Sequence, residues 1–134
     1  MAHILLVEDD ANIAKLLRVR LEHSGHAITT ASDGEQALTS IHADAPDLIL
    51  LDIMLPGLDG FQVAKQLKSD ITTAHIPIMM LTARSDGQSM MIGLGRGADD
   101  YLTKPIDFPD LMRRIETCLR HSVMPTRRSA DECQ

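Results

Sequence analysis

A three-layer α/β fold is predicted for this chain, with a parallel sheet of five strands between two layers of helices. Two observations favour it. Compact apolar runs of strand length recur along the sequence, and segments with the period of an amphipathic helix lie between them. Strands that alternate with helices imply parallel pairing through right-handed crossovers, and therefore a doubly wound (βα)5 sandwich.

The strands are expected where the apolar runs lie. The run from Ala27 to Thr30 alternates between apolar and polar residues, which is typical of an edge strand. A shorter candidate, DYLTK, ends at Lys104. The other three runs are continuously apolar, as expected of strands covered on both faces: Ile4–Val7, Leu48–Leu51 and Pro77–Leu81.

Helices are expected between these runs. The clearest pattern is the last one, where apolar residues follow the spacing i, i+3, i+4, i+7, i+11 from Phe108 to Leu119. Shorter patterns of the same kind run from Ile13 to Leu21 and from Phe61 to Leu67. Three Asp-Gly pairs are placed where helices would start: Asp33-Gly34, Asp59-Gly60 and Asp86-Gly87.

Length and composition indicate one globular domain. The chain has 134 residues, of which 44% are hydrophobic and only 2% aromatic, so the core must be aliphatic. A chain of this size can bury roughly two-thirds of its unfolded surface without help from metals or disulfides. We expect the domain to cover residues 1–121, and residues 122–134, which lack helical periodicity, to form a tail or linker.

Charge and composition also argue against several classes of partner. The net charge of −6 opposes binding to a phosphate backbone, and few aromatic side chains are present to stack on bases. Cys118 and Cys133 form no CxxC pattern and are expected to be free thiols in a reducing compartment. No apolar run is long enough to span a membrane, and the N-terminus lacks a basic leader, so we expect a cytoplasmic protein without membrane contact.

Acidic residues follow two of the expected strands, at the sheet edge where α/β folds bind ligands. The first strand runs into Glu8, Asp9 and Asp10, and the third runs into Asp52. An Asp that ends an apolar run is usually a helix cap or a turn residue, and this alternative stays open for Asp52. Carboxylates gathered from neighbouring strands would repel one another unless a cation lay among them, so the pattern predicts a divalent metal site.

The residue types at this edge favour phosphoryl transfer. All-oxygen ligands suit Mg²⁺, which typically takes one or two carboxylates and keeps waters and a substrate phosphate. Thr82 and Lys104 end the fourth and fifth strands, where a hydroxyl and an ammonium could face phosphoryl oxygens. Asp52 is then left as the nucleophile, which would form an aspartyl phosphate.

Four motifs taken together, ILLVEDD, LILLDIMLPGLDG, IPIMMLTA and GADDYLTKP, resemble the receiver domain of two-component response regulators. The resemblance covers roughly residues 3 to 121, with every motif in order and at family-like spacing. It implies a flavodoxin-like fold with strand order 2-1-3-4-5.

The resemblance implies a role for each residue of the acidic site. Asp52 would be the phosphoacceptor and a metal ligand, and Asp9 a direct ligand of Mg²⁺ or Mn²⁺. Glu8 would bind the ion through water, and the backbone carbonyl of Met54 would be the third protein ligand. Asp10 is expected to be solvated.

The same resemblance assigns the residues that would respond to the phosphoryl group. Thr82 would be the switch hydroxyl, Lys104 the phosphate-binding lysine and Tyr101 the switch aromatic, although Tyr101 taken alone could be an ordinary surface aromatic. The bond before Pro105 would be the family's cis peptide, which costs little before proline.

The function implied by the resemblance is signalling rather than enzymatic turnover. A sensor histidine kinase or phosphotransfer protein would supply the phosphoryl group, and the receiver would catalyse only its own phosphorylation and dephosphorylation. Phosphorylation would then shift the equilibrium between two conformations of the receiver. The favoured conformation would bind a downstream effector through the face formed by the fourth helix, fifth strand and fifth helix. A monomer or a weak phosphorylation-dependent dimer is expected.

The fourth helix departs from the expected pattern. Gly93, Gly95 and Gly97 should make it locally unstable, because glycine inside a helix costs about 1 kcal/mol relative to alanine. Met90, Met91 and Ile92 stand where receivers joined to winged-helix DNA-binding domains often carry basic residues for symmetric dimers. At least one of these methionines is expected in the core, the alternative being an apolar patch that docks a partner.

Two other functions are weighed against the receiver. An enzyme of the haloacid-dehalogenase type would also use a strand-end Asp and Mg²⁺, but it would carry a second Asp where this chain has Met54. A receiver-like interaction module that never takes phosphate would typically lack one of the five site residues, Glu8, Asp9, Asp52, Thr82 and Lys104, that are all present here.

The bulky residues Met54 and Arg84 stand where the family gates the attacking water, so we expect a long-lived phosphoform.

Overall fold

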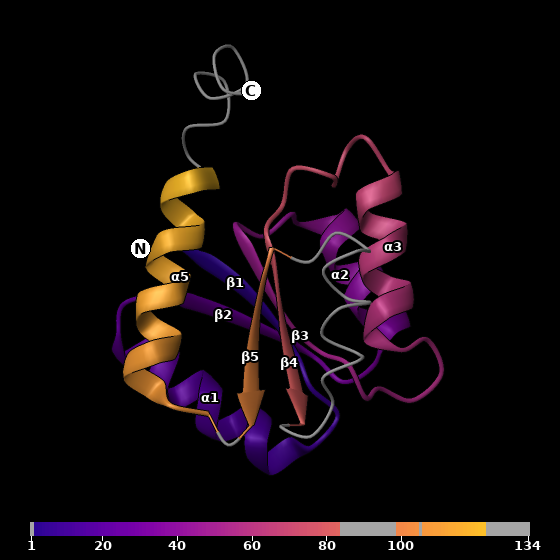
Figure 1. Ribbon diagram of the computed structural model, residues 1–134. Helices are drawn as coiled ribbons and strands as arrows, with labels where there is room; N and C mark the ends of the chain where they lie inside the picture. Colours follow the sequence, from indigo (N-terminus) through magenta and orange to yellow (C-terminus); the bar gives the residue numbers. More distant parts are fainter. Residues whose placement is uncertain (1, 84–98, 105, 123–134) are drawn as a thin grey trace.

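The computed structural model describes residues 2–83, 99–104 and 106–122. These residues form five strands and four helices, and strands and helices alternate from β1 to β4 (Figure 1). The five strands form one parallel sheet with the order β2-β1-β3-β4-β5. This confirms the predicted fold class and strand order. The elements are β1 (His3–Val7), α1 (Ala11–His23), β2 (Ala27–Ala31), α2 (Gly34–Ala43), β3 (Leu48–Asp52), α3 (Gly60–Ser69), β4 (Ile78–Ala83), β5 (Asp100–Lys104) and α5 (Phe108–Ser122).

Burial explains which runs became central strands. All five residues of β3 are buried, because helices cover both faces of the sheet there. In β2 only Ala31 is buried, and this strand lies at the edge of the sheet, as its alternating sequence predicted.

Two apolar clusters fill the space between the sheet and its helices. Side chains of α2 and α3 pack on one face of the sheet, and those of α1 and α5 pack on the other. Figure 1 shows these two pairs of helices on opposite sides of the sheet. Alternation along the strands divides the residues, so that Leu5 and Val7 join the first cluster and Ile4 and Leu6 the second. The layers are therefore those of the predicted sandwich.

The Asp-Gly pairs mark helix starts by a capping mechanism. The carboxylate of Asp33 accepts a hydrogen bond from the backbone N–H of Gln36 at 2.8 Å. Asp33 is thus the N-cap of α2, which begins at Gly34. Asp59 and Gln62 form a complete capping box at the start of α3. The third pair, Asp86-Gly87, and the fourth helix expected near it lie outside the described residues.

Four strands extend further than the apolar runs predicted. β1 starts one residue earlier, at His3, and β2 ends one residue later, at Ala31. β3 includes Asp52, which is paired with Leu81, and β4 starts at Ile78 rather than Pro77 and runs on through Thr82 to Ala83. Ladder pairing, not hydrophobicity, decides where a strand ends. Among the described residues no helix is long and apolar enough to cross a membrane.

Cys118, on α5, is a free and buried thiol. Burial, and then the negative charges of Asp100 and Asp99, raise the pKa of this thiol to about 11. Because the folded pKa lies above the unfolded value of 9.0, the thiolate is disfavoured in the fold, and stability is lost as the pH rises between those two values.

We therefore expect iodoacetamide at pH 8.5 to modify Cys118 far more slowly in the native protein than in urea, since the thiolate is the nucleophile. Peptide mapping would follow the two cysteines separately, and Cys118→Ser would verify the assignment. Equal native and denatured rates at Cys118 would contradict this expectation.

Candidate functional site

Three carboxylates meet at the carboxyl ends of the central strands β1 and β3. Glu8 and Asp9 directly follow β1, and Asp52 is the last residue of β3. Oxygen atoms of these three carboxylates all lie within 4.8 Å of one another. Glu8 and Asp52 are only 3% and 4% exposed, whereas Asp9 is exposed. The structure thus brings together the acidic residues that the sequence placed at this edge.

The local geometry of Asp52 supports both readings of this residue. Its Oδ1 accepts a hydrogen bond from the backbone N–H of Met54 at 3.1 Å, which is a turn contact of the kind expected when Asp ends a strand. The same side chain is buried beside Glu8 and Asp9, so the turn contact fixes a carboxylate inside the acidic cluster.

Asp10 has a role that the sequence reading missed. It is exposed, as expected, but its Oδ1 accepts hydrogen bonds from the backbone N–H groups of Asn12 at 2.9 Å and Ile13 at 3.2 Å. Asp10 is therefore the N-cap of α1. The signal was present, because an Asp directly before a helical period is a typical cap.

Gly60 brings the start of α3 into contact with the end of β3. A Cβ atom on Gly60 would lie 2.6 Å from the carbonyl oxygen of Asp52 and 2.8 Å from the Cα of Ile53. The Gly60 N–H donates to the carbonyl of Ile53 at 2.9 Å. A side chain is excluded here, so the turn after the central strand is held directly by a helix end.

Thr82 and Lys104 occupy neighbouring strands at the same edge. Ladder pairing places Thr82 opposite Thr103 and Ala83 opposite Lys104, the last residues of β4 and β5. The side chains of Thr82 and Lys104, and all of Pro105, lie outside the described part of the chain. Their contacts with a phosphoryl group, and the cis peptide, stay predictions.

Tyr101 is a buried residue of β5. It is 5% exposed and belongs to the cluster that packs under α2 and α3. The reading of Tyr101 as an ordinary surface aromatic is therefore wrong, and its role as a switch residue stays a prediction.

Arg114, on α5, forms hydrogen bonds with two carboxylates and with the backbone of β5. It donates to Asp110 at 3.0 Å, to Asp100 at 2.7 Å and to the backbone carbonyl of Tyr101 at 3.2 Å. Partial burial opposes its charge, but the hydrogen bond to Asp110 and the charge of Asp100 raise the pKa of Arg114 above its ordinary value. The backbone N–H of Tyr101 in turn donates to the Asp100 carboxylate at 2.7 Å.

The acidic cluster fits a hard divalent cation. Its ligand atoms are carboxylate oxygens, the donors that Mg²⁺ and Mn²⁺ prefer. Two of the three carboxylates are almost fully buried, where like charges at such short separation are costly without a counter-ion. Asp9, Asp52 and, through water, Glu8 are the side chains that would hold it, with the Met54 carbonyl as the further predicted ligand.

Comparison with known proteins agrees with this geometry. The family described as response regulator receiver domain matches residues 4–116. The alkaline phosphatase synthesis transcriptional regulatory protein PhoP of Bacillus subtilis is 46% identical over 119 residues, which cover 89% of this chain and 49% of that protein. The DNA-binding response regulator MtrA of Mycolicibacterium paratuberculosis is 42% identical over 119 residues, which cover 89% of this chain and 52% of that protein.

Solved structures show the same fold. The receiver domain of the Francisella response regulator 1452 superposes with a TM-score of 0.84 at 32% identity, over 91% of this chain and 99% of that one. The signal receiver domain of a signal transduction histidine kinase from Syntrophus aciditrophicus gives 0.84 at 32% identity, over 90% of this chain and 91% of that one.

The chain spans about half the length of the curated relatives it matches. Some of those relatives are named as DNA-binding regulators. The expectation that no nucleic acid is bound therefore applies only to the 134 residues of this chain, and for them it stays a prediction. The motifs, the sheet order, the acidic cluster and the family match agree, and the chain belongs to the receiver domain family of two-component response regulators.

Proposed function

We propose that this chain is the phosphoacceptor of a two-component phosphorelay, with Asp52 as the residue that takes the phosphoryl group. The observation that carries the proposal is the meeting of Glu8, Asp9 and Asp52 at the carboxyl ends of β1 and β3. The donor would be the phosphohistidine of a sensor histidine kinase or of a phosphotransfer protein.

In the proposed reaction an oxygen of Asp52 attacks the phosphorus of the donor. A new P–O bond forms to Asp52 while the P–N bond of the phosphohistidine breaks, and the imidazole leaves with the bonding electron pair. The Met54 N–H holds Asp52 in place through its hydrogen bond to Oδ1. A bound Mg²⁺ would neutralise charge on the carboxylates and the phosphoryl oxygens. Thr82 and Lys104 are proposed to bind those oxygens.

The downstream step is proposed to be a population shift. Contacts made only by the phosphorylated site would draw Thr82 inward and rearrange Tyr101, and the face of the fourth helix, β5 and α5 would change its affinity for an effector or output domain. The family resemblance and the position of Tyr101 on β5 support this proposal.

The test is intact mass after incubation with acetyl phosphate, with and without Mg²⁺, beside Asp52→Asn. One added phosphoryl group that requires Mg²⁺ and is absent from the variant is the expected result. A folded wild type that binds Mg²⁺ but gains no mass would favour a phosphorylation-independent module. Continuous release of phosphate from small phosphoesters would instead favour a phosphatase.

Met54 is expected to lengthen the life of the phosphoform. Its side chain is 70% exposed and stands two residues after Asp52, where it would shield the acyl phosphate from water. Met54→Ala should shorten the half-life several-fold in Mg²⁺, measured by loss of the mass adduct after the donor is removed. Met54→Leu, which keeps the bulk, is the control. Loss of the wild-type adduct within seconds would contradict the expectation.

A further inference from the structure

Lys68, near the end of α3, has an ammonium group whose donor capacity is fully used. Its Nζ donates to the backbone carbonyls of Ala74 at 3.0 Å and Ile76 at 2.9 Å, and to Oδ2 of Asp99 at 3.3 Å. An ammonium has three hydrogens to donate, so these contacts account for all of them. The side chain is 22% exposed. One lysine thus joins α3, the loop before β4 and the residue before β5.

Asp99 carries the connection onward into the sheet. Its backbone N–H donates to the carbonyl of Ile78 at 2.7 Å, and its Oδ2 accepts from the N–H of Ile78 at 2.8 Å. Both polar backbone groups of the first residue of β4 are therefore bound by one residue. The ladder proper starts at the next pair, Met79 with Asp100. We call Lys68, Asp99 and the backbone groups they bind the Lys68–Asp99 clamp.

The clamp lies at the amino end of β5, directly before the first ladder pair between β4 and β5. β5 is an edge strand, held within the described sheet by β4 alone. Side chains alternate along a strand, so a slip of one residue would move every side chain of β5 to the opposite face. In the observed register Tyr101 joins the cluster under α2 and α3, and Leu102 joins the cluster under α1 and α5.

The same register decides which residue ends β5 at the acidic edge of the sheet. With Met79 paired to Asp100, the ladder ends with Lys104 beside Ala83. A shift by one would place Thr103 or Pro105 there instead. A contact that holds the amino end of β5 in register would therefore also determine which residue stands at its carboxyl end. Figure 1 shows β4 and β5 side by side and running in the same direction, so that their amino ends lie together and their carboxyl ends lie together at the other end of the strands.

We propose that Lys68 is a positioning residue for the reaction at Asp52. Through Asp99 it holds β5 in the register that delivers Lys104 to the phosphoryl-accepting edge. This inference rests on the proposed function, because it gives Lys104 a part in that reaction. No sequence motif marks Lys68, since its partner Asp99 lies 31 residues away in the chain.

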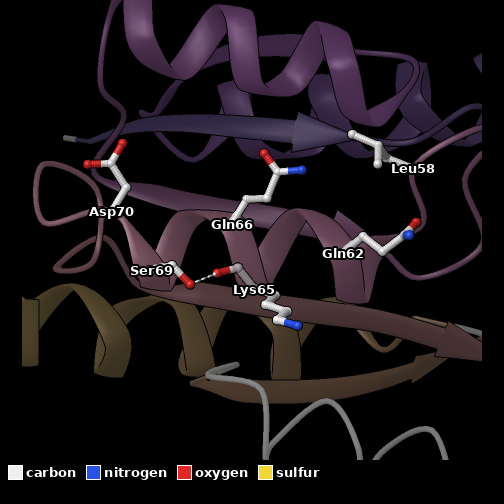
Figure 2. A pocket seen from close by; sticks show the side chains of 6 residues that line it. All are labelled: Leu58, Gln62, Lys65, Gln66, Ser69 and Asp70. Carbon is white, nitrogen blue, oxygen red and sulfur yellow. Dashed lines mark hydrogen bonds between the residues drawn. The ribbon is translucent and has the colours of Figure 1, made fainter.

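The test compares Lys68→Met, Lys68→Arg and Lys65→Met in the full chain. Methionine keeps the aliphatic stem of Lys68 and removes its donors, and arginine restores donors. Lys65 is an exposed lysine on the same helix (Figure 2). Lys68→Met should lower the maximal rate of phosphorylation at saturating acetyl phosphate several-fold. The Mg²⁺ affinity should not change, because the acidic cluster lies on β1 and β3. Lys68→Arg should recover most of the rate, and Lys65→Met should match the wild type.

Amide hydrogen exchange supplies a second readout that does not need phosphorylation. Lys68→Met should speed exchange in β5 while β1 and β3 keep their protection. Asp99→Asn is a milder variant, because it removes only the charge of the carboxylate that Lys68 binds. It keeps an oxygen for the Ile78 N–H and leaves both carbonyl contacts of Lys68 in place. The test can therefore still be made if Lys68→Met fails to fold.

Normal phosphorylation of the wild type together with unchanged rate and exchange in both folded variants would overturn the positioning role alone. A folded wild type that gains no phosphoryl group would instead overturn the proposed function, and the positioning role with it.

Discussion

Mg²⁺ at a hundred times its dissociation constant is expected to raise the free energy of unfolding by about 2.7 kcal/mol, and Asp52→Asn to remove most of that gain. The reason is the cluster of three carboxylates within 4.8 Å, two of them buried, whose mutual repulsion a bound cation would relieve. For the same reason Asp52→Asn should be more stable than the wild type when no divalent ion is present. Neutralising one buried carboxylate lowers the repulsion that folding must overcome.

Urea unfolding in MgCl₂ and in EDTA, at matched ionic strength, measures both effects. Asp10→Ala is the matched control, because Asp10 is an exposed acid next to the cluster that caps α1. Loss of the cap should cost about 1 kcal/mol in either buffer and leave the increment from Mg²⁺ unchanged. An equal increment in Asp52→Asn and the wild type would show that the ion stabilises the protein from elsewhere.

Gly60→Ala is expected to destabilise the protein by about 1–3 kcal/mol, as overpacking of a close contact does. At a position with compatible backbone the same change would stabilise by about 0.4–1 kcal/mol. Here the new Cβ would meet the Asp52 carbonyl oxygen at 2.6 Å. The position of a Cβ is fixed by its own backbone and the carbonyl is part of the main chain, so neither can rotate away. Displacement of the turn after β3 should also weaken Mg²⁺ binding.

Thermal or urea unfolding measures the stability change, with Gln66→Ala as the control. Gln66 is exposed on the same helix, and its substitution should change stability by no more than about 0.5 kcal/mol. A Gly60→Ala variant that is more stable than the wild type would show that helix α3 can move away from β3 at little cost.

The central strands could be predicted from the sequence because burial on both faces leaves an unbroken apolar run, as in Leu48–Leu51. The acidic cluster could be predicted because carboxyl ends of parallel strands meet at one edge. The strand ends could not be predicted as well, since Asp52 and Thr82 are held in their strands by ladder pairing with other strands.

The partners of Lys68 and Arg114 were beyond sequence reasoning for another reason. Lys68 meets Asp99 across 31 residues and Arg114 meets Asp100 across 14, and neither spacing is a helical or strand period. Such pairs are decided by how the elements pack. The cap made by Asp10, in contrast, is local and could have been read from its position before the helix.

At Tyr101 the outer edge of β5 is covered by hydrogen bonds with side chains. Asp100 accepts the hydrogen bond of the Tyr101 N–H, and Arg114 donates to the Tyr101 carbonyl, so both backbone groups of this residue are already bound. An edge strand with unpaired backbone groups is a template for intermolecular β-sheet growth. At this residue a strand from another molecule would have to displace Arg114 and Asp100 before it could pair, which protects the chain against edge-to-edge aggregation.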